Sequence, residues 1–231
     1  MIKLLDKILL SDNVKDEFYK NYNDSEFKAW LLSILPEIEA CKNQKQDNAW
    51  HIYNCLDHIL HSVEAINKLD KDYDSVTRRQ LAYTMCLHDI GKPKCYIRRY
   101  SKLYGREVDS FFNHNLESEK IARRVLPLLN FDEKEQQVIS LLIKNHDIFM
   151  FITLSKDNNK YHKLLTMGLI EDYIKEFSVA GDGRKIMEYL LMVGRADSSA
   201  QNPKMTKDSF KLLDVMEEML QKYCKEQVEN E

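Results

Sequence analysis

The chain has 231 residues, of which 44% are hydrophobic, so it is long enough to bury a sizeable core. Its six Gly and four Pro favour helices over a sheet that is rich in turns. The net charge of −3 gives no case for nucleic-acid or membrane binding by the whole surface, so any preference for anions must come from a local patch.

The five cysteines have no Cys-x-x-Cys spacing, which argues against a disulfide framework and against a zinc ribbon. They are typical of reduced thiols in a cytoplasmic protein. Residues 1–10 carry charges at positions 3, 6 and 7, so they lack the apolar run of a signal peptide or a membrane span. We therefore expect a cytoplasmic protein that does not insert into membranes.

The first part of the chain predicts helices. Residues 1–35 predict two or three short helices with N-caps at Ser11-Asp12 and Asp24-Ser25, and Pro36 predicts a further short helix over 37–41. Residues 50–69 then predict a long helix with a bulky apolar face and a second face of small residues and histidines. The two faces are Ile52, Leu56, Ile59, Val63 and Ile66, and His51, Cys55, His58, Ser62 and Ala65.

The stretch Leu87-His88-Asp89-Ile90-Gly91-Lys92-Pro93 ends the next predicted helix, which follows a turn at 71–75. Leu81, Met85 and His88 share one helical face, and the Gly and Pro of the stretch predict the helix end. Residues 92–106 predict a loop or broken helix with six basic residues and no acid. We interpret them as a candidate anion-binding segment, with a solvated charged face as the alternative.

Two helices that begin or end in a histidine follow. His114 begins an apolar stripe that continues to Leu128, with Pro127 kinking or ending the helix. Residues 132–135 resemble a capping box, and they start a helix whose apolar stripe ends in His146.

The last part of the chain predicts three helices. The first lies around 164–177, the second carries Asp197 on its apolar face, and the third spans 206–224. A carboxylate in an apolar stripe is costly to bury unless it is paired or binds a metal.

Histidines and aspartates thus recur on the inward faces of separate helices. A lone histidine on such a face is more often an ordinary core residue, but six such groups are harder to explain by packing alone. Imidazole nitrogens and carboxylate oxygens suit divalent metals. The six candidate ligands are His58, His88, Asp89, His114, His146 and Asp197.

The order His, His-Asp, His, His, Asp resembles the HD-domain superfamily of metal-dependent phosphohydrolases. The likeness covers residues 35–203. Within the superfamily, this part of the chain is most similar to the HD domain of bacterial CCA-adding tRNA nucleotidyltransferases. The matching motifs are Leu35-Pro36-Glu37, Gln46, His51-Ile52-Tyr53, Asp57-His58, residues 88–93, Phe111 with His114 and Ser118, residues 142–146, and Ala196-Asp197-Ser198-Ser199-Ala200.

The chain departs from this family in two ways. Asn115 stands where the family often has a Glu after its third histidine. We find no nucleotidyltransferase head, because Asp70-Lys71-Asp72 is not preceded by a strand or by a Gly-Ser turn, and we do not expect CCA addition. The resemblance implies an all-α fold with a single HD-domain helical bundle at 35–203. Helices at 1–34 would pack on it, and 204–231 would form an amphipathic helix and a frayed tail.

The resemblance also implies one or two divalent ions of Mn, Fe, Co, Ni, Zn or Mg, with Asp89 bridging two of them. It implies His58, His88, Asp89 and Asp197 as ligands of the first ion, and His114 and His146 as ligands of the second. Such ions bind a phosphoryl oxygen and acidify a water molecule. Asp89 and Lys92 are the catalytic candidates, since Lys92 can neutralise charge that grows on a phosphate.

Four side chains are candidates for contact with substrate phosphate, and for each of them packing or solvation is the alternative. They are Lys92, His61, Arg98 and Arg99, with Arg184 as a weaker anion contact. We expect His51 to lie behind the ligands or in the core, and His162 to be exposed.

We therefore expect a metal-dependent phosphohydrolase that acts on a nucleotide-like phosphomonoester or phosphodiester. The resemblance implies a 2′,3′-cyclic phosphate or a 2′-nucleotide among such esters. The alternatives are a mixed-valent di-iron oxygenase of the same superfamily and a non-catalytic module that binds a nucleotide or RNA. The expected partner is a small-molecule phosphate ester, the net charge gives RNA no support, and the oligomeric state stays open.

Overall fold

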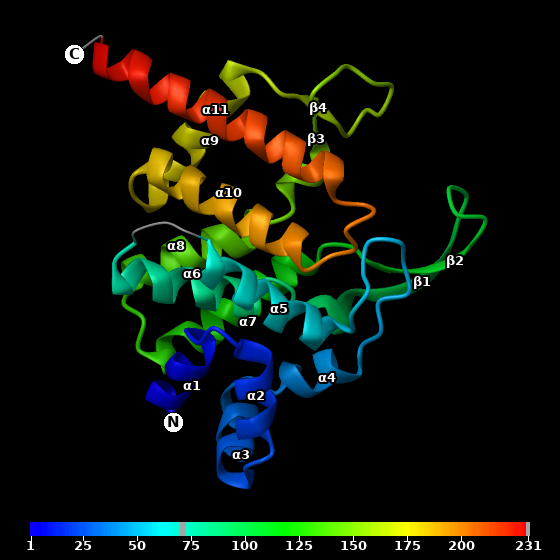
Figure 1. Ribbon diagram of the computed structural model, residues 1–231, viewed down its shortest axis with the longest axis vertical. Coiled ribbons are helices and arrows are strands. Elements are labelled where there is room, and N and C mark those ends of the chain that lie inside the picture. Colours follow the sequence, from blue (N-terminus) through cyan, green and yellow to red (C-terminus); the bar gives the residue numbers. More distant parts are fainter. Residues whose placement is uncertain (70–72, 230–231) are drawn as a thin grey trace.

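Three helices, α5 (Cys55–Lys68), α6 (Ser75–Leu87) and α10 (Gly183–Ser199), pack against one another at the centre of the protein (Figure 1). The computed structural model describes residues 1–69 and 73–229, with side chains up to residue 227. Both α5 and α10 bury several successive turns, which explains their apolar stripes. The three helices form the frame on which the rest of the chain is placed.

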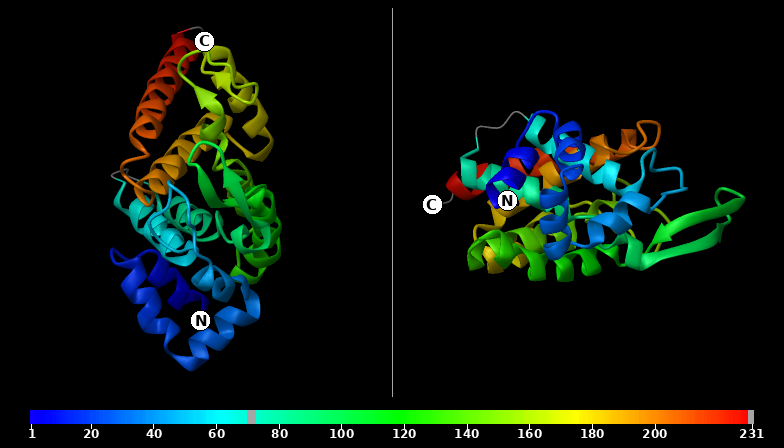
Figure 2. Two further views of the ribbon diagram at one scale, coloured as in Figure 1. Left: turned by 90° about the vertical axis from the view of Figure 1, so that its right-hand side faces the viewer. Right: turned by 90° about the horizontal axis from the view of Figure 1, so that it is seen from below.

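Four short helices, α1 (Ile2–Leu9), α2 (Val14–Tyr22), α3 (Ser25–Ile34) and α4 (Glu37–Asn43), cover one end of this frame (Figure 2). Helix α1 packs on α6, while α2 and α4 pack on α5. Asp24 caps α3 as predicted, since its carboxylate accepts hydrogen bonds from the amides of Glu26 and Phe27. The predicted cap at Ser11-Asp12 is wrong, because α2 begins later, after Asn13.

Helices α7 (His114–Val125) and α8 (Glu133–Asn145) form a pair that packs on α6. Asp132 and Glu135 form the predicted capping box at the start of α8. The other end of the frame is covered by α9 (Met167–Phe177) and α11 (Lys207–Glu229), which pack on α10. In the described residues, four short 3-10 helices complete the helical part: η1 (Lys92–Cys95), η2 (Leu126–Leu129), η3 (Ile148–Phe151) and η4 (Ser178–Ala180).

Two small sheets accompany the helices. Strands β1 (Tyr96–Ser101) and β2 (Arg106–Phe111) form an antiparallel hairpin in which Tyr96 pairs with Phe111 and Ser101 pairs with Arg106. Strands β3 (Ile152–Thr153) and β4 (Lys163–Leu164) form a short parallel pair. The chain is thus mostly α-helical, as predicted.

The hairpin corrects the prediction of a loop or broken helix over residues 92–106. Tyr96, Ile97 and Tyr100 favour an extended chain, and Gly105 adopts the left-handed φ of 61° that the turn requires. The hairpin projects from the helical body, beside the loop that precedes α5 (Figures 1 and 2). Most residues of β1 are exposed, so the segment lacks the alternating apolar pattern by which a strand is predicted.

Three helix boundaries also differ from prediction. Helix α5 begins at Cys55 rather than near Trp50, because Asn54 caps it, and Ile52 is consequently 54% exposed. Helix α7 ends before Pro127, so Leu128 is exposed rather than part of its stripe. Thr166 caps α9, which leaves residues 163–164 free to form β4.

The buried core is continuous across the chain and contains residues from α1 to α11. None of the described helices combines the length and apolar character that a membrane crossing requires. The predicted turn at 71–75 and the interpretation of Asp70-Lys71-Asp72 fall at least partly on residues 70–72, outside the described residues. The end of the predicted frayed tail, residues 230–231, lies outside them as well.

Candidate metal centre

The six predicted ligands lie at helix ends or in terminal turns that meet at one place. His58 is in the first turn of α5, and Asp197 is in the last turns of α10. His88 and His146 are the C-cap residues of α6 and α8, and His114 is the first residue of α7. The last carbonyls of a helix have no partner within the helix, so they can accept hydrogen bonds from side chains placed at these ends.

Four of the ligands form a first cluster around one oxygen of Asp89. The Nε2 atom of His58 lies 3.1 Å from Asp89 Oδ2 and 3.0 Å from Asp197 Oδ1. The Nε2 atom of His88 lies 3.4 Å from Asp89 Oδ2 and 3.6 Å from Asp197 Oδ1. His58, His88 and Asp197 form one group that could hold a metal ion, and Asp89 forms overlapping groups with His51 and His58 and with His88 and His146.

The other oxygen of Asp89 faces the remaining two histidines. Asp89 Oδ1 lies 3.1 Å from His114 Nε2 and 3.6 Å from His146 Nε2. Asp147 joins these two histidines in a second group that could hold an ion. The carboxylate of Asp89 therefore stands between two sets of imidazoles, the arrangement that a bridging ligand requires.

The orientation of all four imidazoles is fixed by the main chain. His88 Nδ1 lies 2.7 Å from the Met85 carbonyl, His146 Nδ1 2.7 Å from that of Ile143, and His114 Nδ1 2.8 Å from that of Phe111. His58 Nδ1 reaches the Ala200 carbonyl at 3.2 Å. A carbonyl oxygen only accepts hydrogen bonds, so each Nδ1 carries a proton and each Nε2 is turned toward the cluster.

This arrangement needs a positive charge among the Nε2 atoms. The Nε2 atoms of His58 and His88 are 3.3 Å apart, and those of His114 and His146 are 3.1 Å apart. Two lone pairs at such distances repel unless a proton or a metal ion lies between them. Both carboxylate oxygens of Asp89 are buried without a well-directed hydrogen bond. Because buried polar atoms seldom lack partners, these donors fit a divalent metal site.

Charge and burial act in opposite directions on the same groups. Burial opposes ionisation of Asp89, but the charges of His88 and Lys92 outweigh it and hold the pKa of this carboxyl well below its usual range. Burial also opposes protonation of His88, yet Asp89 and Asp197 raise the pKa of its imidazole to about 10. The pKa of His58 is raised for the same reason. Without a metal, protons thus occupy part of the cluster.

Lys92 is buried beside the cluster rather than solvated, with its side chain 5% exposed. Its Nζ atom lies 2.5 Å from Asp89 Oδ2, 2.9 Å from Gln46 Oε1 and 3.0 Å from His51 Nε2. Burial and the charge of Lys92 hold the pKa of His51 well below its usual value, so the neutral ring accepts from the ammonium. Asn48 Oδ1 accepts from His51 Nδ1 at 2.9 Å and fixes that ring.

Arg98 and Arg99 lie on the hairpin, and they differ in their partners. Arg98 pairs with Asp109 at 2.7 Å and with Asp47 at 2.9 Å, which occupies its guanidinium. Arg99 donates to Ser110 at 2.8 Å and stacks over the ring of Phe112, with no carboxylate partner among the described residues. Arg99 is therefore the more available of these two predicted phosphate contacts.

His61 faces a different pocket. Its ring pairs with Glu64 at 3.1 Å and lies 4.4 Å from the ring of Tyr53, and it lines a pocket of about 200 Å³ that also contains Lys68. The position one turn after His58 predicted a shared face, but three residues along a helix turn the side chain aside by about 60°. His162 pairs with Asp157 in the β3–β4 loop, and Arg184 lies in the first turn of α10 and pairs with Asp182.

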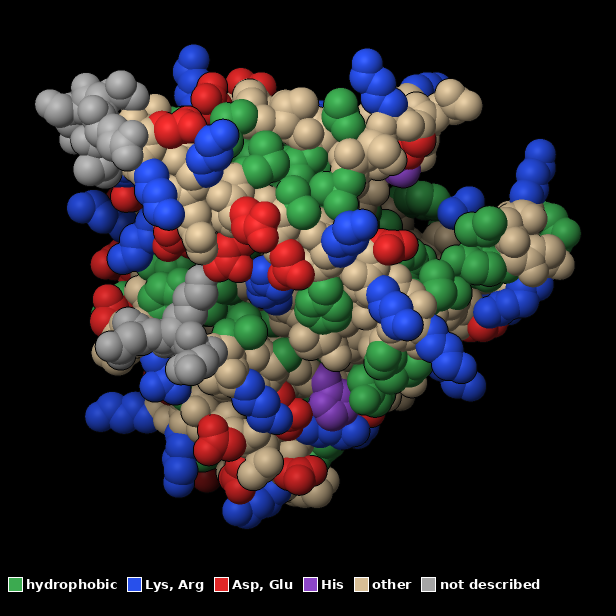
Figure 3. All heavy atoms as spheres, turned by 45° about the horizontal axis from the view of Figure 1, so that its top comes forward, with side chains coloured by type: hydrophobic (Ala, Val, Ile, Leu, Met, Phe, Trp, Pro, Cys, Tyr) green, Lys and Arg blue, Asp and Glu red, His purple; other side chains and the backbone are tan. Residues whose placement is uncertain are grey.

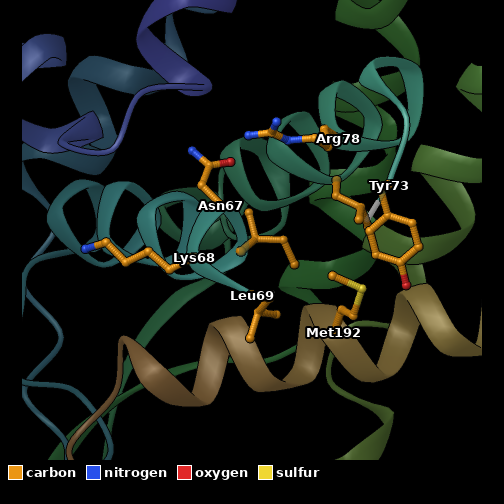
Figure 4. A pocket seen from close by; sticks show the side chains of 8 residues that line it. Asn67, Lys68, Leu69, Tyr73, Arg78 and Met192 are labelled. Carbon is orange, nitrogen blue, oxygen red and sulfur yellow. The ribbon is translucent and has the colours of Figure 1, made fainter. Parts of the chain in front are cut away.

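A larger pocket of about 330 Å³ lies between α5, α6 and α10 (Figure 4). Its lining mixes apolar side chains with Asn67, Lys68 and Arg78, and contains none of the six candidate ligands. Leu69 and Tyr73 flank residues 70–72, which are not described, and we assign no site there.

Sequence reasoning missed several side chains that hold the cluster in place. Gln46 was part of a matching motif, but its contact with Lys92 was not foreseen. Gln201 donates to Asp197 Oδ2 at 2.9 Å, and Asn115 donates to the Lys144 carbonyl at 2.6 Å, beside His146. Asp147 was not predicted as a ligand, and the only signal for it in the sequence is that it follows His146.

No family model matches the chain. Over 140 residues, 55% of the chain, it is 24% identical to a bifunctional uridylyltransferase/uridylyl-removing enzyme of Cereibacter sphaeroides and 23% identical to that of Ruegeria pomeroyi. Over 188 residues, 76% of the chain, it is 23% identical to the enzyme of the same name from Gluconobacter oxydans. The matches cover only 13%, 14% and 17% of these three proteins, so the chain resembles a small part of each.

Proposed function

We propose that the chain is a metal-dependent phosphohydrolase of the HD type that acts on a nucleotide-like phosphate ester. The observation that carries this proposal is the position of Asp89, whose two oxygens face two separate pairs of imidazoles. The names of the distant relatives include a uridylyl-removing activity. Removal of a uridylyl group breaks a phosphate ester, so this similarity supports the same class of reaction.

In this proposal, His58, His88, Asp89 and Asp197 hold one divalent ion, and His114 and His146 hold a second with Asp89 between them. Bound divalent ions supply Lewis acidity and an acidified water molecule. The protein aims the Nε2 atoms inward through the four backbone carbonyls that accept from Nδ1.

Lys92 supports hydrolysis of an anionic ester over the oxygenase alternative. Its ammonium is held beside Asp89 by Gln46 and His51, at the point where negative charge grows on a phosphate during transfer. A cation of this kind stabilises an anionic transition state and has no evident task in the oxidation of a neutral substrate. Intact ligands likewise favour turnover over binding alone.

The experiment is a panel of phosphomonoesters and phosphodiesters, including 2′,3′-cyclic nucleotides and 2′-nucleotides, assayed with Mn, Ni, Co, Fe, Zn or Mg. We expect Asp89→Asn to lower turnover by at least about 10²-fold, since it disturbs both clusters. Elemental analysis should show less bound metal in this variant. Asp172→Asn, an exposed change on α9, serves as the matched control and should change neither quantity.

Two outcomes would count against the proposal. One is a metal-loaded protein that leaves the whole panel unchanged. The other is hydrolysis that Asp89→Asn does not slow. Activity that requires iron and consumes oxygen would instead favour the oxygenase alternative.

A further inference from the structure

Exposed apolar side chains gather in segments next to the metal centre. Among the large hydrophobic side chains that are exposed in the described residues, two lie at 50–52, seven at 96–116 and four at 150–161, while only four lie elsewhere. The first segment includes His51, the second includes the hairpin and His114, and the third follows His146 in the chain. Such a concentration marks a binding surface, because soluble proteins otherwise scatter their exposed apolar residues.

The same region is locally basic. The three segments 50–52, 96–116 and 150–161 together contain six Lys or Arg and three Asp or Glu, a balance of +3 in a chain whose net charge is −3. The rest of the chain is therefore acidic. Charge asymmetry of this kind favours an anionic partner at this side of the molecule, although the whole chain has no basic character.

The hairpin is held in place by contacts with Asp47 along its length. The carboxylate of Asp47 forms ion pairs with Arg98 at 2.9 Å and with Arg106 at 2.8 Å. The backbone amide of Asp109 donates a hydrogen bond to the Asp47 carbonyl at 3.0 Å. These contacts tie both strands to the loop before α5. At the outer end, Tyr100 is 62% exposed, and Lys102 is exposed without a carboxylate partner among the described residues. The hairpin is therefore a fixed arm with free aromatic and cationic groups.

The base of the arm contacts Lys92, which lies beside the metal centre. Lys92 lies over the ring of Phe111 at 5.6 Å, and this ring lies 6.0 Å from that of Tyr96. Phe112 is 56% exposed, carries Arg99 over its face at 4.9 Å, and precedes His114 by two residues. Figure 3 shows the surface recessed between the hairpin and the loop that joins β3 to β4. A ligand along the arm would thus continue into the recess.

We propose that residues 96–112, here called the hairpin surface, bind a single-stranded nucleic acid whose terminal phosphate ester is the substrate at the metal centre. Exposed aromatic rings stack with bases, and unpaired cations contact the backbone, as in other proteins that bind single strands. The strands of the arm are about 20 Å long, which spans several nucleotides and exceeds what a free nucleotide would cover. Only the placement of the terminal ester rests on the proposed function.

Binding is measured with the Asp89→Asn protein, which keeps the probe intact. The probes are fluorescein-labelled oligouridylate and oligothymidylate of about 12 nucleotides and the corresponding duplex. Their binding is measured by fluorescence anisotropy at several salt concentrations. We expect both single strands to bind more tightly than the duplex. Tyr100→Ala and Phe112→Ala should each weaken binding by about 5- to 150-fold, the range found for the loss of one stacked base.

Charge is tested separately from stacking. Lys102→Ala should weaken binding and reduce the slope of log Kd against log salt by about 0.7, the value of one phosphate contact to a single strand. Lys134→Ala is the matched control, because this exposed lysine lies at the far end of α8, about 18 Å along the helix from His146. It should leave both the affinity and the slope unchanged.

Equal binding by the parent and all hairpin variants would overturn the inference, as would equal binding of single strands and duplex. Binding of neither nucleic acid would also overturn it, and would leave a protein surface as the occupant to seek. These outcomes are independent of turnover. Loss of hydrolysis with intact strand binding contradicts only the proposed function, whereas hydrolysis of mononucleotide esters without strand binding contradicts only this inference.

Discussion

Lys92 combines two roles that oppose each other. Its ammonium stabilises the ionised Asp89 carboxylate at 2.5 Å, yet the same positive charge repels any metal ion that Asp89 would bind. Its Nζ atom contacts Gln46 and His51 and forms an ion pair with Asp89, so a substrate phosphate has to compete with these groups. Substitution of this lysine should therefore change metal affinity and turnover in opposite directions.

We predict that Lys92→Met binds metal several-fold more tightly, because a nearby positive charge is lost. Turnover of the phosphate ester should fall by about 10²-fold, the typical loss when one stabilising donor of a transition state is removed. Isothermal titration with Mn and steady-state kinetics measure the two quantities. Lys94→Met is the control, since Lys94 pairs with Glu117 on the surface. A Lys92→Met variant with weaker metal binding would contradict this account of Lys92.

Proton release should accompany metal binding. In the metal-free chain, the pKa of His88 is raised to about 10 and that of His58 is also raised, so these rings hold protons at neutral pH. A metal ligand must be deprotonated, so the ion displaces these protons. Apparent metal affinity should rise with pH through the neutral range and level off near the His88 pKa of about 10. Addition of Zn to weakly buffered protein should acidify the solution, and a pH-independent affinity would contradict the expectation.

At the scale of elements, Gly91 shows why the turn after α6 tolerates no side chain. Its φ is −81°, a value open to any residue, so conformational freedom is not the reason for glycine. A Cβ atom at this position would lie 2.6 Å from the amide nitrogen of Ser118 and 2.8 Å from the His114 carbonyl. The amide of Gly91 also donates to Ser118 Oγ at 2.9 Å. The turn and α7 are therefore in direct backbone contact, which brings His114 to Asp89.

We predict that Gly91→Ala destabilises the protein by about 1–3 kcal/mol, because backbone atoms must move to admit the methyl group. It should also lower the affinity of the site formed by His114 and His146 more than that of the other site. Gly168→Ala is the control, since a Cβ there would lie 3.9 Å from its nearest neighbour within α9, and alanine favours a helix. Thermal denaturation and metal titration check both variants. Equal melting temperatures would contradict the packing explanation.

The helices were predictable from sequence and the hairpin was not, for a physical reason. Helical stripes such as Ile139, Ile143 and His146 follow from spacing alone, and they brought the six ligand candidates to light. Strand β1 is exposed on most positions, so it has no alternating apolar pattern, and it is ordered by Asp47, which lies 51 residues from Arg98 in sequence. The partners of Lys92 were hidden in the same way, because Gln46 and His51 precede it in a segment of irregular structure.

At the scale of the whole molecule, the predicted segments 1–34, 35–203 and 204–231 share one core. Leu9 and Phe18 from the first segment and Met216 and Leu220 from the last belong to the same buried cluster as the central helices. We propose that they fold as a single cooperative unit, because neither terminal segment has a separate core in the described residues.

The two tryptophans allow this to be tested. Trp30 lies on α3 in the first segment, and Trp50 lies beside His51 near the metal centre. In the Trp50→Phe variant, the remaining Trp30 reports on the first segment. In the Trp30→Phe variant, the remaining Trp50 reports on the region near the metal centre. We expect their fluorescence transitions in urea to coincide with each other and with loss of helical circular dichroism. A Trp30 signal that changes at lower urea would show that the first segment unfolds independently.

The attachment of Nδ1 to backbone carbonyls has a consequence for how such a protein can change over time. His88, His114 and His146 each bond to a carbonyl only three residues earlier, within their own turn. The orientation of these rings is thus set by local chain geometry and does not depend on which apolar residues fill the interior. Nearly all of the surrounding sequence can drift while the inward aim of these rings survives, which is compatible with identities of only 23–24% to the distant relatives.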